Sequence, residues 1–291
     1  MSFSSDVKEE LVRQTSKSRH CQIAELAAIL ACDGLVEEAP LRVSLRSENP
    51  LLLQKYALLM RLVFGVDISK PLAAEDVSRL LDAVKWTPDN ANGGRTSGLL
   101  LQKTCCRRAF LRGAFLAVGS ISDPQKGYHL ELVARGMEQA LQLQEIMQDF
   151  ELDAKIVERK GHDVVYLKEG AQIVDMLNVM EAYVSLMNLE NVRILKEMRN
   201  SVNRKVNCET ANISKTVNAA VKQIQDIERI RDAIGLESLP EHLRQMAELR
   251  LEYPDTPLQA LGELLDPPVG KSGVNHRLRK LAEIAAECES K

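Results

Sequence analysis

Two apolar helical stretches decide the fold: CQIAELAAILACDG at residues 21–34 and RRAFLRGAFLAVGS at residues 107–120. Each is rich in small residues and is interrupted by a glycine near its end. Ala28 and Cys32 stand four residues apart in the first stretch, and Gly113 and Ala117 repeat this spacing in the second. Small side chains at this spacing form a smooth stripe along which two helix backbones can approach closely. Although any buried helix pair can carry such a stripe, it predicts that these two helices pack together.

A similar order of strands and helices follows each stretch. Leu41, Val43 and Leu45 alternate as on one face of a strand, and residues 127–134 and 154–168 also have strand patterns. Helical patterns cover Ser5–Gln14, Gln22–Asp33, Asn49–Phe64, Ala74–Val84, Arg107–Ala117 and Met137–Phe150. Because the strand-then-helix order occurs twice, an internal repeat is predicted. Beyond about residue 185 only helical periods remain, which predicts an α+β domain followed by an all-α domain.

Composition limits the function classes. A length of 291 residues predicts about two domains, and 38 basic against 41 acidic residues give a net charge of −3. The whole chain therefore lacks the strong positive field of many nucleic-acid-binding proteins. No uncharged apolar run approaches the ~18 residues that span a bilayer. The opening MSFSSDVKEELVRQ lacks the apolar core of a secretory signal, so we expect a cytoplasmic protein without a membrane partner.

Metal or cofactor chemistry is not expected from the pattern of potential ligands. The cysteines form no C-x-x-C pair, and the histidines are dispersed. The cysteines are Cys21, Cys32, Cys105, Cys106, Cys208 and Cys288, and the histidines are His20, His129, His162, His242 and His276. Scattered cysteines of this kind usually behave as small buried apolar residues. We therefore expect no structural metal and no cofactor.

Residues 191–235 predict a basic amphipathic helix, broken near residues 207–210. Its expected apolar stripe is Ile213, Val217, Val221, Ile224 and Ile227. Residues 193–231 contain nine basic and four acidic residues, a local charge of +5. Such a charge run can be a solvated helix face or can contact phosphate. The candidates for phosphate contact are Arg199, Arg204, Lys205 and Lys215.

The end of the chain predicts three short helices. The first spans residues 240–251. Thr256 is a candidate N-cap before Pro257, which opens a helix through Leu265. Residues 266–270 must turn because two prolines interrupt the helix, and a last helix spans residues 272–287. On it, a buried stripe is expected at Val274, Leu278, Leu281 and Ala285.

A short helix, a tight turn and a helix that starts with polar and basic residues are what a helix-turn-helix reader of the major groove requires. Residues 267–281 contain four basic residues and no acid. The candidate DNA-binding residues are Lys271, Ser272, Asn275, His276, Arg277, Arg279 and Lys280. Asn275 and Arg279 could address base edges, whereas Lys271 and Ser272 suit phosphate. The alternative is a three-helix bundle whose basic face only keeps it soluble.

Residues 26–34 and 111–119 resemble the LAGLIDADG pattern of homing endonucleases twice, the second copy being degenerate. The resemblance implies a saddle built from a pair of αββαββα repeats. In the nucleases, the residue before the final glycine of each copy is an acid that holds a divalent metal. Here these positions are Asp33 and Val118. Because valine cannot bind a metal, we expect no catalytic residue and only a vestigial acid, Asp33.

One other acid lies near the second copy and could in principle replace the metal ligand that is missing at Val118. Asp123 follows Val118 by five residues, in the sequence Ser122-Asp123-Pro124. This sequence is typical of an Asx turn, which is the ordinary role of such a residue. An active metal-dependent endonuclease therefore remains the less favoured alternative.

The whole chain resembles the WhiA family, chiefly through residues 198–224 and PPVGKSGVNHRLRKL at residues 267–281. The resemblance implies a transcriptional regulator of sporulation, cell division and chromosome segregation that binds promoter DNA and has no nuclease activity. The domains expected are a LAGLIDADG homing-endonuclease-like domain at 1–188, a basic helical connector at 189–235 and a helix-turn-helix domain at 236–291. A nucleoid-associated location and another transcription factor as a partner are further expectations.

The sequence leaves the role of the saddle open. A protein-docking scaffold is an alternative to a DNA-binding one. Basic residues on or near its strands could contact DNA without sequence preference, although ordinary surface charge explains them equally well. These residues are Arg42, Arg46, Lys126, Arg159 and Lys160.

Overall fold

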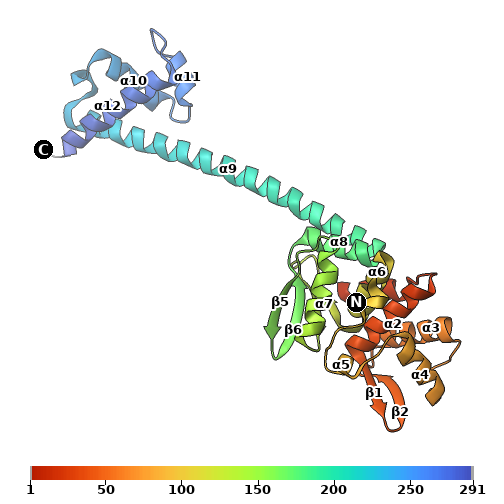
Figure 1. Ribbon diagram of the computed structural model, residues 1–291. Helices are drawn as coiled ribbons and strands as arrows, with labels where there is room; N and C mark the ends of the chain where they lie inside the picture. Colours follow the sequence, from red (N-terminus) through yellow and green to blue (C-terminus); the bar gives the residue numbers. More distant parts are fainter. Residues whose placement is uncertain (1, 290–291) are drawn as a thin grey trace. The chain divides into compact units, whose positions relative to one another are not determined.

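The computed structural model describes residues 2–289. Its internal contacts divide the chain into two compact units, Met1–Glu197 and Met198–Lys291. The first unit mixes helices and strands, and the elements described in the second are helices (Figure 1). None of the described helices is long and apolar enough to span a membrane. Each unit has its own hydrophobic core.

A close pair of helices forms the centre of the first unit. Helix α2 (Arg19–Asp33) and helix α6 (Thr104–Val118) are largely buried along their lengths. A Cβ atom placed on Gly113 of α6 would lie 2.5 Å from the carbonyl oxygen of Glu25 and 3.0 Å from the Cβ of Ala28. The two backbones therefore approach too closely for a larger side chain at this crossing. The predicted packing of the two helices is confirmed.

Two antiparallel sheets accompany this helix pair (Figure 1). The first is a hairpin of β1 (Gly34–Glu38) and β2 (Leu41–Leu45). The second has the order β3-β4-β6-β5, formed by β3 (Gly119–Ile121), β4 (Leu130–Ala134), β5 (Lys155–Arg159) and β6 (His162–Leu167). The strands predicted at Leu41–Leu45 and within residues 127–134 and 154–168 are confirmed. Strands β1 and β3, each of which begins at the glycine that ends a central helix, were not predicted.

The two copies of the repeat differ in length. The second copy runs α6, β3, β4, α7 (Met137–Gln148), β5, β6 and α8 (Gly170–Met180), which is the full αββαββα order. In the described residues, the first copy has the single hairpin β1–β2, followed by helices only. These are α3 (Pro50–Phe64), α4 (Ala74–Ala83), α5 (Pro88–Ala91) and the 3₁₀ turn η1 (Gly98–Leu101). Helix α1 (Phe3–Arg13) precedes both copies and contributes Val7 and Leu11 to the core.

A buried ion-pair network joins the central helices. One carboxylate oxygen of Glu25 on α2 lies 3.1 Å from the guanidinium of Arg112 on α6 and 3.1 Å from the ammonium of Lys55 on α3. Arg112 also donates to the carboxylate of Glu181 at 2.8 Å and to the hydroxyl of Ser16 at 3.0 Å. A buried charge without a partner is strongly destabilising. The network therefore fixes which residues of α2, α3 and α6 face one another.

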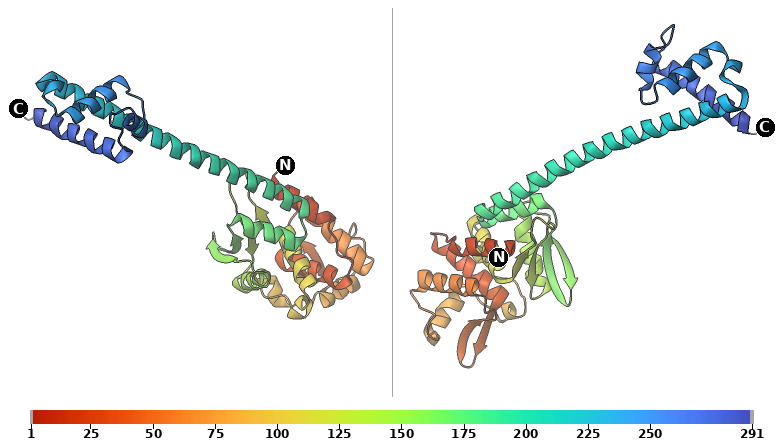
Figure 2. Two further views of the ribbon diagram at one scale, coloured as in Figure 1. Left: turned by 90° about the horizontal axis from the view of Figure 1, so that it is seen from above. Right: turned by 180° about the vertical axis from the view of Figure 1, so that it is seen from behind.

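Helix α9 (Tyr183–Ile234) is continuous, so the predicted break near residues 207–210 is wrong (Figure 2). The segment contains Asn, Cys, Glu and Thr but neither proline nor glycine. These residues cost at most about 0.7 kcal/mol each relative to alanine, which does not end a helix. The predicted apolar residues do lie on one helix, but most of this stripe is exposed. Ile213, Val217 and Val221 are about half or more exposed, and Ile227 is buried.

Three helices and the end of α9 build the second unit. They are α10 (Glu241–Glu252), α11 (Leu258–Glu263) and α12 (Lys271–Glu289), with the short 3₁₀ turn η2 (Leu236–Ser238) before them. The predicted stripe of α12 is confirmed, because Val274, Leu278, Leu281 and Ala285 are all buried. They pack with Ile227 and Ile230 of α9 and with residues of α10 and α11, including Leu243, Met246 and Leu261.

The start of α11 differs from the prediction. Its N-cap is Pro257, not Thr256, and the helix ends at Glu263 instead of Leu265. The carbonyl oxygen of Thr256 accepts a hydrogen bond of 2.9 Å from the guanidinium of Arg250, which is 2% exposed. This contact holds the segment before α11 against α10. Thr256 therefore helps to close a loop through its backbone instead of capping a helix through its hydroxyl.

Candidate functional site

The ends of the central helices bring Asp33 and Val118 into one hollow of about 450 Å³. Gly34 and Gly119 are the C-caps of α2 and α6, so these two residues hold equivalent positions in the two copies. The hollow is also lined by Arg46, Arg135 and His162. The two positions that carry metal-binding acids in LAGLIDADG nucleases thus face a common space. Only one of them offers an oxygen ligand.

Asp33 is engaged by its own protein. It is 8% exposed, and one of its carboxylate oxygens accepts a hydrogen bond of 3.0 Å from the backbone N–H of Ser47. Burial raises the pKa of Asp33 above its ordinary value, while the Ser47 hydrogen bond and the positive charges of Arg135 and Arg46 oppose this rise. The carboxylate therefore accepts a backbone hydrogen bond and lies within the positive field of two arginines.

Arg135 supplies positive charge beside the single acid. Its Nε donates to the carbonyl oxygen of Cys32 at 2.9 Å, and its Nη2 donates to that of Gly34 at 2.7 Å. Burial, together with repulsion from Arg46, lowers the pKa of Arg135. Two guanidinium groups near one carboxylate disfavour the approach of a divalent cation. Among the described residues, Asp33 is the one acid that lines the hollow, and Arg46 and Arg135 line it as well.

Asp123 does not replace the missing acid. Its carboxylate accepts a hydrogen bond of 2.9 Å from the backbone N–H of Gln125, and its carbonyl oxygen accepts from the N–H groups of Lys126 and Gly127. This is the predicted Asx turn. Asp123 is not among the residues that line the hollow of Asp33 and Val118.

Helices α11 and α12 cross closely at Gly262. A Cβ atom on this residue would overlap the carbonyl oxygen of Val269 and lie 3.0 Å from a methyl group of Val274. The N–H of Val269 in turn donates to the carbonyl oxygen of Gly262 at 3.0 Å. The turn between the helices is therefore fixed to α11 by backbone contact, and the start of α12 is fixed with it.

The first turns of α12 present most of the predicted DNA-binding residues to solvent. Lys271, Ser272, Asn275, His276, Arg279 and Lys280 are exposed. Spacings of four residues place Lys271, Asn275 and Arg279 along one face of the helix. The side chain of Arg279 is 81% exposed, and its nearest acid is Glu283 at 3.6 Å. A hydrogen bond from Lys280 to Glu283 raises the pKa of Lys280.

Arg277 differs from the other six residues. It is only partly exposed and donates a hydrogen bond of 3.4 Å to the carbonyl oxygen of His242 at the start of α10. On the helix, it lies at the edge of the buried stripe, three residues after Val274 and four before Leu281. Its contact therefore supports the packing of α10 against α12.

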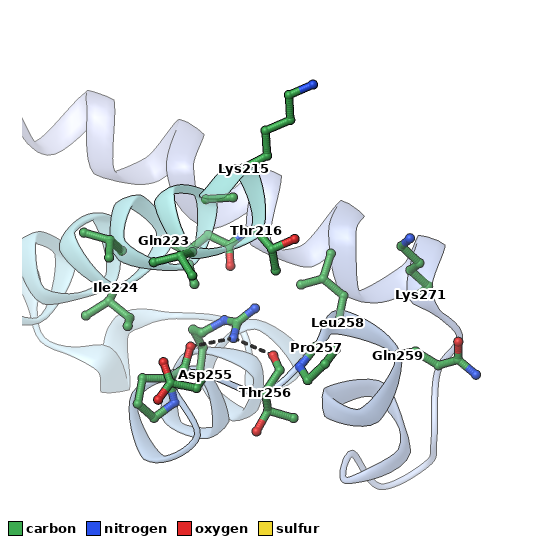
Figure 3. A pocket seen from close by; sticks show the side chains of 16 residues that line it. Lys215, Thr216, Gln223, Ile224, Asp255, Thr256, Pro257, Leu258, Gln259 and Lys271 are labelled. Atoms are coloured by element: carbon green, nitrogen blue, oxygen red, sulfur yellow. Dashed lines mark hydrogen bonds between the residues drawn. The ribbon is translucent and has the colours of Figure 1, made fainter. Parts of the chain in front are cut away.

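A hollow of about 770 Å³ lies beside α12, between residues 215–224 of α9 and the segment 254–259 (Figure 3). Arg250 lines the hollow and donates hydrogen bonds to the carbonyl oxygens of Pro254 and Thr256 at 3.2 and 2.9 Å. Lys271 is part of its lining, and Lys215 extends from it toward solvent (Figure 3). The structure thus brings one predicted phosphate contact of α9 near the start of α12. The others, Arg199, Arg204 and Lys205, are exposed on α9.

The sequence pattern did not predict a group of four residues that could hold a metal ion. His20, Cys21, Cys105 and Cys106 place one ligand atom each within 4.8 Å of one another. Of the six cysteines, Cys21, Cys32 and Cys106 are buried as predicted, whereas Cys105 and Cys208 are exposed and Cys288 is partly exposed, contrary to the prediction. The pairs His20-Cys21 and Cys105-Cys106 hold equivalent positions before the two repeat copies. That equivalence was the available signal, because adjacent ligands on separate helices match no common metal motif.

Comparison with known proteins identifies the family. Residues 107–199 match the WhiA LAGLIDADG-like domain, and residues 202–285 match the WhiA C-terminal HTH domain. The "Probable cell division protein WhiA" of Lachnoclostridium phytofermentans is 50% identical over 308 residues, covering 98% of both chains. Its namesake from Alkaliphilus oremlandii is 50% identical over 314 residues, covering 99% of this chain and 98% of that one. The chain belongs to the WhiA family.

A solved WhiA structure supports the same assignment. The crystal structure of full-length DUF199/WhiA from Thermatoga maritima matches with a TM-score of 0.61 at 25% identity, over 99% of both chains. The resemblance drawn from residues 198–224 and 267–281 is therefore confirmed. The predicted fold class, a LAGLIDADG-like α+β domain followed by an all-α helix-turn-helix domain, is confirmed as well.

Proposed function

We propose that this WhiA family member is a DNA-binding transcriptional regulator whose helix α12 reads the major groove of promoter DNA. One observation carries the proposal. The second helix of the helix-turn-helix presents six polar or basic side chains to solvent within its first three turns. A helix of this kind enters the major groove with its N-terminal residues against the base edges. Residues 267–281, which include these turns, contain no acid to repel phosphate.

The side chains divide by chemistry into reading and positioning groups. Asn275 and Arg279 can form paired hydrogen bonds with adenine and guanine edges, whereas Lys271 and Ser272 suit phosphate. His276 and Lys280 flank this face, and Arg277 contributes through its contact with α10. The exposed basic residues of α9 extend the phosphate contacts; they are Arg199, Arg204, Lys205 and Lys215. We assign residues 236–291 to DNA reading and residues 189–235 to a basic connector.

The saddle, residues 1–188, serves in this proposal as a binding scaffold without nuclease activity. Support comes from Val118 in the position of the second acid and from Arg135 beside the first. Supercoiled plasmid incubated with Mg²⁺ or Mn²⁺ should stay intact. Nicking by the wild-type chain that disappears in Asp33→Ala would overturn this part of the proposal.

The process follows from the relatives, which are named as probable cell division proteins. We propose that the chain acts in cell division, and that it also acts in sporulation and chromosome segregation as the family resemblance implies. Its site of action would be the nucleoid in the cytoplasm, with another transcription factor as a partner at promoters.

A binding experiment tests the reading helix. Genome-wide mapping of bound DNA supplies a specific site, and fluorescence anisotropy then compares it with a scrambled duplex. Asn275→Ala and Arg279→Ala should each weaken specific binding by about 1–3 kcal/mol, or about 5- to 150-fold. Lys271→Ala should weaken binding to both duplexes and reduce the salt slope by about one.

The control lies on the same helix. Glu287→Ala changes an exposed residue beyond the reading face and should bind like the wild type. Unchanged binding in the Asn275, Arg279 and Lys271 variants would refute the assignment of α12.

A further inference from the structure

A compact cluster of three thiols and one imidazole lies at the N-terminal ends of the two central helices. The Nδ1 atom of His20 is 3.2 Å from the Sγ atom of Cys106 and 3.3 Å from that of Cys21. With the Sγ atom of Cys105, all four ligand atoms lie within 4.8 Å of one another. This cluster is at the opposite ends of α2 and α6 from Asp33 and Val118. It is therefore distinct from the position of the nuclease metals.

The cluster has a buried half and an open half. Cys21 and Cys106 are buried and pack with Ala24 and Ala109 in a small apolar core of their own. His20 and Cys105 are exposed. Each helix contributes one buried and one exposed ligand from equivalent positions, so the arrangement follows the symmetry of the repeat. An ion could enter from the exposed side and be held against the buried sulfurs.

The cluster lies in the first turn of both central helices. The positive ends of the α2 and α6 dipoles are therefore directed at it and favour the thiolate forms of cysteine that bind metal.

The distances suit a tetrahedral ion. Zinc bonds sulfur at about 2.3 Å and imidazole nitrogen at about 2.0 Å, so a tetrahedral site places its ligand atoms roughly 3.5–3.8 Å apart. The present spacings of 3.2 and 3.3 Å and the maximum of 4.8 Å require only small side-chain movements to reach that geometry. A disulfide would join two of the sulfurs, but it would not explain why the imidazole nitrogen lies close to both buried thiols.

We propose that His20, Cys21, Cys105 and Cys106 bind one zinc ion that clamps the N-terminal ends of α2 and α6. Three cysteines and one histidine form a closed ligand set of the kind that holds structural zinc. Thiolate ligands and a tetrahedral site favour zinc over magnesium or calcium. On binding, the three thiols release their protons to solvent, and the neutral imidazole donates its nitrogen lone pair. The ion joins the two repeat copies across 85 residues of sequence.

Metal analysis of the full-length chain tests this proposal. Protein purified under reducing conditions should contain one zinc per chain, released by a chelator in competition. Cobalt substituted for zinc should show thiolate charge-transfer absorption and the visible bands of a tetrahedral ion. His20→Ala and Cys105→Ser remove exposed ligands without opening a core cavity. Each should lower zinc affinity by more than about 100-fold, since even outer-shell changes cost about 10- to 100-fold.

Matched controls separate binding from folding. Cys208→Ser removes an exposed thiol on α9 and should bind zinc like the wild type. Cys21→Ser and Cys106→Ser should abolish binding, and if these buried variants fail to fold, the two exposed variants decide the question. Circular dichroism should show His20→Ala and Cys105→Ser to be folded.

Three results would overturn the proposal. The first is a reduced, folded chain that retains no zinc and gives no cobalt–thiolate absorption. The second is zinc binding that His20→Ala and Cys105→Ser leave unchanged. The third is a Cys21–Cys106 disulfide, found by mass spectrometry in metal-free protein purified without reductant, that persists when zinc is supplied with reductant. Each outcome is independent of DNA binding.

Discussion

At the scale of single residues, the interior of the first unit contains a few charged side chains that pair with one another. Replacing one of them would leave a buried charge without its partner. Glu25 serves two cations, Lys55 and Arg112, and Arg112 reaches on to Glu181. Glu181 lies just beyond α8, in a left-handed backbone conformation, and also accepts a hydrogen bond of 2.9 Å from Gln14. This carboxylate closes the network at its partly exposed end.

Glu181→Gln should make stability less sensitive to acid. Burial alone would raise the pKa of Glu181, but hydrogen bonds from Gln14 and Arg112 and the charge of Arg112 outweigh it, so the pKa lies below the ordinary 4.5. A depressed carboxyl pKa stabilises the folded state above 4.5 and loses that contribution as the pH falls through the folded value. We expect Glu181→Gln to cost about 1–2 kcal/mol at neutral pH. The difference from wild type should shrink below about pH 4.5.

Urea unfolding over a pH series measures this effect. Glu158→Gln, an exposed change on β5, serves as the control and should follow the wild type. A stability difference between Glu181→Gln and wild type that stays constant from neutral to acidic pH would contradict the assigned role.

The roles of residues that follow a helical spacing in the sequence were predictable, whereas roles that depend on contacts between distant segments were not. The small residues Ala28 and Gly113 predicted a helix crossing, because each belongs to a pair of small residues spaced by about one helical turn. Arg135 carries no such signal: it follows β4 and reaches the end of α2 only in the folded chain. The His20 cluster was missed although the packing of α2 on α6 was predicted, because adjacent ligands on two separate helices match no common metal motif.

At the scale of elements, most helices and the strands β2, β4, β5 and β6 were predicted, whereas β1, β3 and α8 were not. The buried stripe of α12 followed directly from residue spacing. Strands β1 and β3 begin at the glycines that end α2 and α6, so their first residues read as the end of a helix. The break expected in α9 failed because polar residues were taken as an interruption. Propensity differences of this size do not stop a helix that lacks proline and glycine.

The crossing of α11 and α12 predicts a specific sensitivity at Gly262. In Gly262→Ala, the added methyl group would overlap the backbone of Val269, which cannot move without disturbing the turn. We expect the second unit to lose about 1–3 kcal/mol and DNA affinity to fall, although alanine is the better helix former. Gly270→Ala in the same turn is the control, because its Cβ would meet no atom within 4 Å.

Urea unfolding and anisotropy with the mapped DNA site read out both variants. If Gly262→Ala behaves like Gly270→Ala in both measurements, then the close crossing does not position α12.

At the scale of the whole molecule, the order of domains was predictable but the completeness of the repeat was not. The change from mixed patterns to helical periods marks the passage from the α+β unit to the helical one. The net charge of −3 conceals the basic segments 193–231 and 267–281, so the total says little about partners. The first repeat copy passes from β2 into α3 and α4, and its helical patterns were visible. That no second hairpin follows among the described residues became clear only from the fold.

Two separate cores predict two unfolding transitions. The core of the first unit and that of the second share no residue, although α9 contributes Leu189 to the first and Ile227 and Ile230 to the second. The single tryptophan, Trp86, packs against the first core, so its fluorescence reports that unit alone, while far-ultraviolet circular dichroism reports helices of both. We expect the two signals to give different midpoints in urea. The two-state approximation should fail for the chain as a whole.

Variants at the two glycine crossings assign these transitions. Gly113→Ala forces α2 and α6 apart and should lower the midpoint of the Trp86 fluorescence transition. In thermal scans of a unit this size, each kcal/mol of lost stability should lower the melting temperature by about 2–4 °C. Gly262→Ala should leave the Trp86 transition in place and shift only the remaining ellipticity change. Because α9 runs from one unit into the other, a strongly coupled chain would instead lose both signals at one midpoint. A shift of the Trp86 fluorescence midpoint by Gly262→Ala would show that the cores unfold together.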